Sequence, residues 1–239
     1  MPITTRLVDY DHDGLRCEGF VAIPDDAAGP RPGLLIAHTW AGRNDFVMDK
    51  ARELAAMGYV AFALDMYGAG RVGQSVEDCA ALMGDVMRDR VLLQHRITAA
   101  LSALQQLPEV DPQRIAALGF CFGGLCVLDL ARTGASLRGV ISFHGLFTPP
   151  ENPLTAPIVA KVLVLHGFED PMATPEQAVE LGRELTARGA DWQLHWFGHT
   201  QHAFTNPLAN DPALGTVYNA AADRRAGRCL TDFLDEVLK

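Results

Sequence analysis

Short, nearly continuous apolar runs alternate along the chain with segments whose apolar residues recur at helical spacing. Runs of this kind are typical of strands buried on both faces of a parallel sheet, and the intervening pattern is typical of amphipathic helices. The pattern predicts strands at Gly33–Ala37, Tyr59–Leu64, Ile115–Leu118, Val140–Phe143, Val162–Leu165 and Trp192–Phe197. It predicts helices at Asp45–Met57, Asp85–Leu107, Gly123–Arg132, Pro175–Arg188 and Asn219–Leu238.

This alternation predicts an α/β fold with a mostly parallel central sheet and helices on both of its faces. The opening segments Thr4–Val8 and Leu15–Ile23 are expected to form an antiparallel hairpin on the edge of the sheet. Gly and Pro gather only at short turns, so residues 1–239 are predicted to form a single domain. In such sheets the chemistry lies beyond the carboxyl ends of the strands, and the residues that follow each apolar run are therefore the candidates.

Composition narrows the class of partner. Hydrophobic residues make up 49% of the 239 positions, enough for a sizeable core, which excludes a disordered protein. Lys and Arg number 20 against 29 Asp and Glu, a formal net charge of -9. Such a surface, without a Lys/Arg cluster, repels phosphate backbones and acidic membranes. We expect neither nucleic acid nor a membrane as a partner.

The cysteines and the N-terminal segment indicate the compartment. The five cysteines are scattered and form no CxxC pair, so neither a zinc site nor a disulfide framework is predicted. The first residues lack the apolar core of a signal peptide, and no apolar run reaches the roughly 18 residues of a membrane helix. A cytoplasmic protein is expected.

The strongest motif is Gly119-Phe120-Cys121-Phe122-Gly123-Gly124, which follows a predicted strand and opens a predicted helix. G-x-C-x-G in this context is the nucleophile-elbow pattern, with Cys where Ser is commoner. The glycines permit a sharp turn that lifts the thiol above the sheet, at a helix N-terminus whose dipole favours thiolate. Cys121 is the candidate nucleophile and the Phe122 N–H a candidate oxyanion donor. The alternative for Cys121 is a buried cysteine in a tight turn. Cys126, five residues further on and inside the predicted helix, is expected to be a core residue.

A cysteine nucleophile needs a base and an orienting acid, which follow it along the chain in the order acid, then His. Asp170 lies in the loop after Val162–Leu165, with its neighbour Glu169 as the alternative acid. The loop after the last strand contains His199 and His202, and spacing alone does not separate them as bases.

Other polar residues also follow strands. His38, His144 and His166 are placed to ring the site, although each could equally be a buried histidine bonded to backbone. Asp65 has the alternative of a loop cap. No HExxH-type spacing occurs, so no metal is predicted.

The Cys121 motif, His166-Gly167-x-x-Asp170 and His202-Ala203-Phe204 together resemble the dienelactone hydrolase family of α/β-hydrolases. Similarity at residues 218–223 and 233–234 extends the resemblance over nearly the whole chain. It implies a Cys121–His202–Asp170 triad, because the family's catalytic His directly precedes a small residue and Phe. By the same resemblance His199 borders the pocket, and the second oxyanion donor is the Trp40 N–H.

Two positions depart from the family pattern. Thr39 stands where the archetype has a Glu that pairs with the resting thiol, and Asn206 stands where it has an Arg that binds the substrate carboxylate. The fold and the triad carry over, but the natural substrate does not.

These residues predict a hydrolase that cleaves small esters or lactones through a Cys121 acyl-enzyme, without a cofactor, as a monomer or small homo-oligomer. An apolar, aromatic pocket suited to neutral aryl esters is expected, with Arg71 as the cation able to bind a carboxylate instead. The alternatives are phosphotriester hydrolysis by the same triad and a non-catalytic or redox-sensing thiol protein on the same fold. The predicted pocket residues are Thr39, Tyr67, Arg71, His144, Phe147, His199, Phe204 and Asn206.

Overall fold

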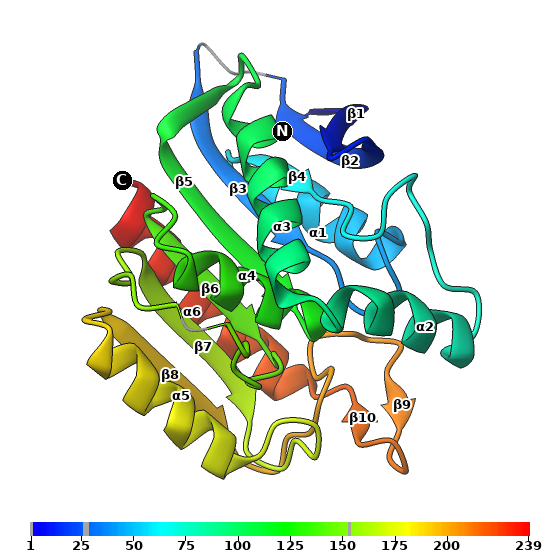
Figure 1. Cartoon of the computed structure of the whole chain (residues 1–239), viewed down its shortest axis with the longest axis vertical. Coiled ribbons are helices and arrows are strands. Elements are labelled where there is room, and N and C mark those ends of the chain that lie inside the picture. Colours follow the sequence, from blue (N-terminus) through cyan, green and yellow to red (C-terminus); the bar gives the residue numbers. More distant parts are fainter. Residues whose placement is uncertain (1, 26–28, 153) are drawn as a thin grey trace.

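The computed structural model describes residues 2–25, 29–152 and 154–239. An eight-stranded sheet crosses the molecule in the order β1-β2-β4-β3-β5-β6-β7-β8 (Figure 1). Its strands are β1 (Ile3–His12), β2 (Leu15–Pro24), β3 (Arg31–Ala37), β4 (Val60–Ala63), β5 (Val110–Phe120), β6 (Gly139–Phe143), β7 (Lys161–Gly167) and β8 (Trp192–Phe197). A short separate hairpin is formed by β9 (Asn210–Asp211) and β10 (Thr216–Val217).

Strands β3 to β8 pair in parallel, whereas β1 pairs antiparallel with β2, and β2 with β4. The predicted mostly parallel sheet with an antiparallel N-terminal hairpin on its edge is therefore confirmed. Parallel strands need crossover connections, and the helices between them supply these.

Helices cover both faces of the sheet. One face packs against α3 (Arg90–Gln105), α4 (Phe122–Arg132) and α5 (Pro175–Ala187), and the other against α1 (Asp45–Ala56) and α6 (Ala220–Leu238). Alternate residues of one strand enter the two cores: Leu35 lies in the first, Leu34 and Ile36 in the second. This period of two explains why each strand reads as a continuous apolar run.

The predicted helix Asp85–Leu107 is wrong in its extent. The segment is divided between α2 (Val76–Met87) and α3, which are separated at Asp89. Asp89 is extended (φ −129°, ψ 95°), and its carboxylate accepts the Leu92 N–H at 2.9 Å. An N-cap of this kind begins a new helix. Apolar periodicity alone does not reveal the division, because residues of both helices, such as Val86 and Leu93, pack in the same core.

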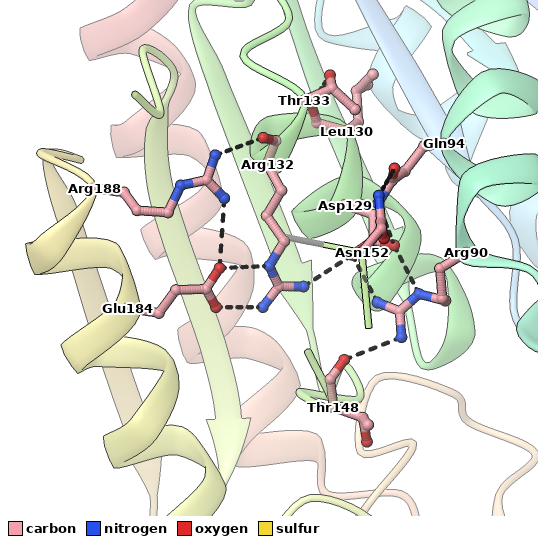
Figure 2. A network of polar contacts seen from close by, with 10 residues as sticks. All are labelled: Arg90, Gln94, Asp129, Leu130, Arg132, Thr133, Thr148, Asn152, Glu184 and Arg188. Atoms are coloured by element: carbon pink, nitrogen blue, oxygen red, sulfur yellow. Dashed lines mark hydrogen bonds and ion pairs between the residues drawn. The ribbon is translucent and has the colours of Figure 1, made fainter. Parts of the chain in front are cut away.

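A buried ionic network joins three of the helices (Figure 2). Asp129 and Arg132 of α4 are buried, and both oxygens of Asp129 are bonded by Arg90 of α3 at 2.7 Å. Arg132 donates to Asp129 at 2.9 Å and to both oxygens of Glu184 of α5 at 2.7 and 2.9 Å. Arg188 completes the chain by donating to the Arg132 carbonyl. The network holds α4 between its two neighbouring helices.

The carboxyl ends of the parallel strands, together with the α2 segment and the β9–β10 hairpin, surround one end of the sheet (Figure 1). This is the end at which ligands bind in open α/β sheets. Within the described ranges, no helix is both long and apolar enough to span a bilayer.

Candidate active site

Cys121 occupies the sharp turn between β5 and α4. Its backbone is at φ 58° and ψ −118°, a left-handed region that L-residues rarely adopt, at a cost of order 1–3 kcal/mol. The strand-side N–H of Cys121 donates to the Phe143 carbonyl of β6 at 3.0 Å, and its carbonyl receives the Gly124 N–H at 2.9 Å. The turn is thus held from both sides, and Cys121 itself remains partly exposed.

The flanking glycines are required by close backbone packing. A Cβ on Gly119 would lie 2.1 Å from the Gly123 carbonyl oxygen. A Cβ on Gly123 would lie 2.2 Å from the carbonyl oxygen of Ala37, the last residue of β3. Because α4 begins in direct contact with the ends of two strands, any side chain at these positions would push Cys121 out of place.

His202 and Asp170 are in contact with each other at the carboxyl ends of the strands, the same end of the sheet as Cys121. Nδ1 of His202 lies 2.7 Å from Oδ2 of Asp170, and both side chains are buried. The second oxygen, Oδ1, accepts the Met172 N–H at 2.8 Å. With Nδ1 donating to the carboxylate, Nε2 of His202 bonds no nitrogen or oxygen of the described residues, which leaves it for the Cys121 thiol and for a substrate.

The β9–β10 hairpin positions the His202 backbone. The His202 N–H donates to the Gly215 carbonyl at 2.9 Å, and its carbonyl accepts the Val217 N–H at 3.1 Å. His202 thereby forms a parallel bridge with Thr216. A short hairpin far from the sheet core thus sets where this imidazole lies.

The Cys121 thiol and the His202 imidazole each shift the pKa of the other. Burial raises the pKa of Cys121, but the charge and hydrogen bond of His202 and the N–H groups of Phe122 and Trp40 outweigh it, so the thiol pKa is lowered. Burial also disfavours the His202 cation, yet the Cys121 thiolate and the Asp170 carboxylate raise the pKa of His202 to about 10. Both shifts favour a thiolate beside an imidazolium.

The rival acid and base pair with each other instead. Nδ1 of His199 lies 2.9 Å from Glu169, and the His199 side chain is 97% exposed. The two residues therefore form a solvent-exposed hydrogen bond with each other, and neither bonds Cys121 or Asp170.

Two other strand-end polar residues, Asp65 and His166, are bound to backbone, whereas His144 bonds the Thr205 hydroxyl at 2.8 Å. The Asp65 carboxylate accepts the N–H groups of Tyr67, Gly68 and Gly70 at 2.8–2.9 Å, so it caps its own loop. His166 bonds the Ala173 carbonyl at 2.7 Å, which stabilises the loop that carries Asp170. Among the described residues, no group of three or more His, Cys, Asp or Glu side chains is arranged to hold a metal ion.

A cavity of about 290 Å³ opens in front of Cys121 and His202. Cys121, His144 and His202 are the titratable residues of its described lining, and no Lys, Arg, Asp or Glu of the described chain contributes to it. It is lined by Thr39, Trp40, Phe46, Met83, Cys121, His144, Leu146, Met172, His202, Ala203, Asn206, Ala209, Leu214 and Thr216. Of the predicted pocket residues, Thr39, His144 and Asn206 are therefore present.

Two predicted aromatic pocket residues belong to the core instead. Phe147 packs on the His166 ring, with centroids 4.6 Å apart. Phe204 is fully buried between Phe197 and His144. Burial of these large apolar rings is favourable by itself, which explains why aromatic residues near strand ends do not have to face a pocket.

Tyr67, Arg71 and His199 also lie outside the cavity lining. The Tyr67 hydroxyl donates to the Trp40 carbonyl at 2.8 Å, and its ring stacks on Phe122. The exposed Arg71 guanidinium donates to the carbonyls of its own loop, at Tyr67 and Gly68, so it is turned away from the cavity. His199 is at the solvent-exposed rim with Glu169.

Most of the apolar lining was missed by the sequence interpretation. Phe46 and Met83 come from α1 and α2, Met172 from the loop after β7, and Leu214 from the β9–β10 turn. None of these residues directly follows a predicted strand, so strand-end position gives no signal for them. The isolated apolar residues among the polar residues 206–216 are the one local hint.

Comparisons with known proteins show the family and agree with the fold. The model of the dienelactone hydrolase family matches residues 17–238. A crystal structure of P91, a dienelactone hydrolase-like promiscuous phosphotriesterase from metagenomic libraries, superposes with a TM-score of 0.95 at 36% identity over 99% of each chain. A putative carboxymethylenebutenolidase of Aquifex aeolicus is 24% identical over 98% of this chain and 99% of its own.

A third relative, the uncharacterised protein K02A2.1 of Caenorhabditis elegans, is 39% identical over 147 residues, which cover 60% of this chain and 93% of its own. The matched family model spans both Cys121 and His202, as well as the strands that position them. The chain is an ester or lactone hydrolase that belongs to the dienelactone hydrolase family.

Proposed function

We propose that this protein hydrolyses small neutral esters or lactones through a Cys121–His202–Asp170 triad and a covalent acyl-enzyme. The observation that carries the proposal is the arrangement around Cys121. Its thiol is at an elbow, is contacted by His202 and by the N–H groups of Phe122 and Trp40, and His202 is in turn bonded to Asp170. Nucleophile, base, orienting acid and two oxyanion donors are together at one point.

The reaction follows from these positions. The Cys121 thiolate attacks the substrate carbonyl carbon, and the N–H groups of Phe122 and Trp40 stabilise the resulting oxyanion. The imidazolium of His202 gives its Nε2 proton to the leaving alkoxide, and the carbonyl re-forms as a thioester on Cys121. Neutral His202 then takes a proton from water as the water oxygen attacks the thioester. The tetrahedral intermediate collapses to the carboxylic acid and the Cys121 thiolate, and His202 keeps the proton as the imidazolium that starts the next cycle.

Asp170 keeps the imidazole in the productive tautomer. Its Oδ2 accepts from Nδ1 at 2.7 Å, so Nε2 is the nitrogen that exchanges the proton with substrate. The carboxylate also stabilises the imidazolium, because the two charges are in contact in a buried site.

The cavity favours a small and uncharged substrate. A volume of about 290 Å³ is at the lower end of small-molecule pockets. Met83, Leu146 and Leu214 offer apolar surface to an aryl or short alkyl group, and Asn206 stands where a carboxylate-binding cation would be needed.

A phosphotriester is a second candidate substrate. The observation that favours it is the close structural similarity to P91, which is described as a promiscuous phosphotriesterase. A neutral phosphotriester also meets the requirement of the uncharged cavity, and its tetrahedral phosphorus presents an oxygen to the same two N–H donors.

We further infer that the protein acts without a cofactor, in the cytoplasm, as a monomer or small homo-oligomer. All five cysteines are free thiols, which suits a reducing compartment. The negative net charge supports small molecules rather than nucleic acid as partners.

The test compares the rates at which wild type and Cys121→Ser hydrolyse p-nitrophenyl acetate and a p-nitrophenyl dialkyl phosphate. Turnover of the acetate, with a transient acetyl group on Cys121 detected by intact-protein mass spectrometry, supports the proposal. Faster turnover of the phosphotriester assigns the second candidate. No turnover of either, with Cys121 still reactive towards iodoacetamide, identifies a redox-sensing or non-catalytic thiol instead.

A further inference from the structure

The peptide unit between Thr39 and Trp40 is held at both of its ends. Its N–H is that of Trp40, which lines the cavity together with Cys121, and as a hydrogen-bond donor it lowers the pKa of the Cys121 thiol. Its carbonyl, that of Thr39, lies 2.6 Å from Nδ1 of His38. A carbonyl oxygen only accepts, so Nδ1 of His38 carries the proton and donates it. One imidazole is therefore bonded directly to the peptide that presents a proposed oxyanion donor.

The other nitrogen of His38 is equally well defined. Nε2 accepts the Met66 N–H at 3.1 Å, and an N–H only donates. The two partners together require the neutral ring with the proton on Nδ1. His38 is fully buried, and this burial lowers the pKa of His38 to about 4, so the ring stays neutral at the pH of catalysis.

We propose that His38 is a positioning residue for the oxyanion hole, which fixes and polarises the Thr39–Trp40 peptide so that the Trp40 N–H points at the reacting centre. The inference rests on the proposed function, since it assigns to the Trp40 N–H the stabilisation of an oxyanion.

The physical basis is the planarity of the peptide unit. Because its carbonyl and N–H are antiparallel in one rigid plane, a hydrogen bond that holds the Thr39 carbonyl also sets the direction of the Trp40 N–H. A carbonyl that accepts a strong hydrogen bond also makes the N–H of the same peptide a better donor. Donors that are already oriented lower the barrier because they need no reorganisation as charge develops.

Met66, whose N–H donates to His38, belongs to a turn that several hydrogen bonds hold in place. Arg96 of α3 donates to the Met66 carbonyl at 2.8 Å. The neighbouring Asp65 carboxylate bonds three N–H groups of the same turn, including those of Tyr67 and Gly68. The His38 ring also packs on the Tyr67 ring, with centroids 4.7 Å apart. His38 thus connects the Thr39–Trp40 peptide to the Met66 turn, which is itself fixed by hydrogen bonds.

Tyr67 provides a matched comparison. Its hydroxyl donates to the Trp40 carbonyl at 2.8 Å, so it too forms a buried hydrogen bond to this loop. That carbonyl belongs to the next peptide unit, between Trp40 and Ala41, and not to the one with the Trp40 N–H. Removal of either side-chain bond weakens the loop, but of these two side chains only His38 acts on the donor peptide. The Thr39 carbonyl of that peptide also accepts the Gly42 N–H, at the longer distance of 3.2 Å.

The experiment separates the two hydrogen bonds of His38. His38→Asn keeps a donor near the position of Nδ1 and loses the contact with Met66, whereas His38→Gln keeps an acceptor near Nε2 and loses the donor to Thr39. Both variants are compared with Tyr67→Phe for kcat and KM on p-nitrophenyl acetate, for Tm, and for the pH dependence of Cys121 alkylation by iodoacetamide.

We expect His38→Gln to lower kcat by about 10- to 100-fold with KM within about twofold, because a misdirected oxyanion donor mainly affects the transition state. The alkylation midpoint should also move to higher pH, since the Trp40 N–H stabilises the resting thiolate. His38→Asn should recover most of kcat and of the midpoint, and Tyr67→Phe should lose less than about threefold in kcat.

Equal kcat in the Asn and Gln variants, or a loss in Tyr67→Phe as large as in His38→Gln, would overturn the positioning role. Activity that survives in Cys121→Ala would instead reject the proposed function. An inactive Cys121→Ala together with equal His38 variants leaves the proposed function standing and rejects His38 alone.

Discussion

Oδ2 of Asp170 lies 2.7 Å from Nδ1 of His202, a residue 32 positions further along the chain. Both side chains are buried, and the Asp170 carboxylate is fixed on its other oxygen by the Met172 N–H. The ring of His202 is therefore held in one tautomer, with Nε2 left for the thiol and for a substrate. The contrast with His199, which pairs with Glu169 in solvent, leads to the first prediction.

Cys121→Ala and His202→Ala should each lower kcat/KM for p-nitrophenyl esters by about 10³-fold or more, since each removes a member of one catalytic unit. His199→Ala is the matched control, because it removes a histidine from the same loop and should cost far less. Steady-state kinetics of the three variants measure this. Equal losses in the two histidine variants would contradict the assignment of His202 as the base.

The resting thiolate gives a second prediction. The thiol pKa of Cys121 is lowered and the pKa of His202 is raised to about 10, so both shifts favour a thiolate–imidazolium pair. Iodoacetamide should therefore alkylate Cys121 rapidly below about pH 7, and an ester substrate should protect it. Alkylation rate as a function of pH is the measurement.

Cys126 serves as the internal control, because burial raises the pKa of this thiol well above its ordinary value and it should not react. An alkylation profile for Cys121 that rises only near about pH 8.5, as for an ordinary thiol, would show that the ion pair is absent.

The third prediction concerns substrate charge. The cavity has no Lys or Arg among its described lining residues, and Asn206 faces it. Neutral aryl esters should exceed matched carboxylate-bearing esters by at least about tenfold in kcat/KM, about 1.4 kcal/mol. Asn206→Arg should narrow the ratio by supplying a charge-assisted hydrogen bond. Arg71→Ala should leave it unchanged, since Arg71 bonds its own loop. A wild-type preference for the anion that disappears in Arg71→Ala would refute this.

The network of Figure 2 gives a prediction about stability. Asp129→Ala would leave the guanidinium groups of Arg90 and Arg132 without the carboxylate that they share. The loss of one partner from a buried ionic network costs about 3–5 kcal/mol, because the remaining charge stays desolvated. Urea unfolding of wild type and variant near neutral pH measures the difference. A loss in the free energy of unfolding no larger than that caused by a surface substitution would mean that water replaces the Asp129 carboxylate.

Glu184 adds a pH dependence to the same network. Burial raises the pKa of Glu184, but the guanidinium groups of Arg132 and Arg188 outweigh it, so the pKa in the folded state is lowered. A lowered folded pKa stabilises the protein above the unfolded value, and this stabilisation disappears as the pH falls through the folded value. Glu184→Gln should thus lower the free energy of unfolding at neutral pH, and the difference from wild type should disappear in acid. Glu180→Gln on the same helix, which breaks an exposed pair with Arg183, should change little at either pH.

Local features were readable from the sequence. The strands, the hairpin at the edge and the Cys121 elbow depend on periodicity and on glycines within two positions of the cysteine, and the steric conflicts at Gly119 and Gly123 bear out that reading. The division at Asp89 was missed because one side-chain cap outweighs a continuous apolar pattern.

The positions of the strands along the chain, the elbow and the chain order of nucleophile, acid and histidine were thus determined by the sequence itself, because short-range sterics and alternating burial act between near neighbours. The order of the strands in the sheet, which places β4 between β2 and β3, was decided by the tertiary structure. Only the tertiary structure decided that His202 and not His199 bonds Asp170, that Arg71 turns away, and that Met83 and Leu214 form the cavity wall. In irregular loops the direction of a side chain is set by distant partners, as the Gly215 carbonyl sets that of His202, and local spacing carries no record of such contacts.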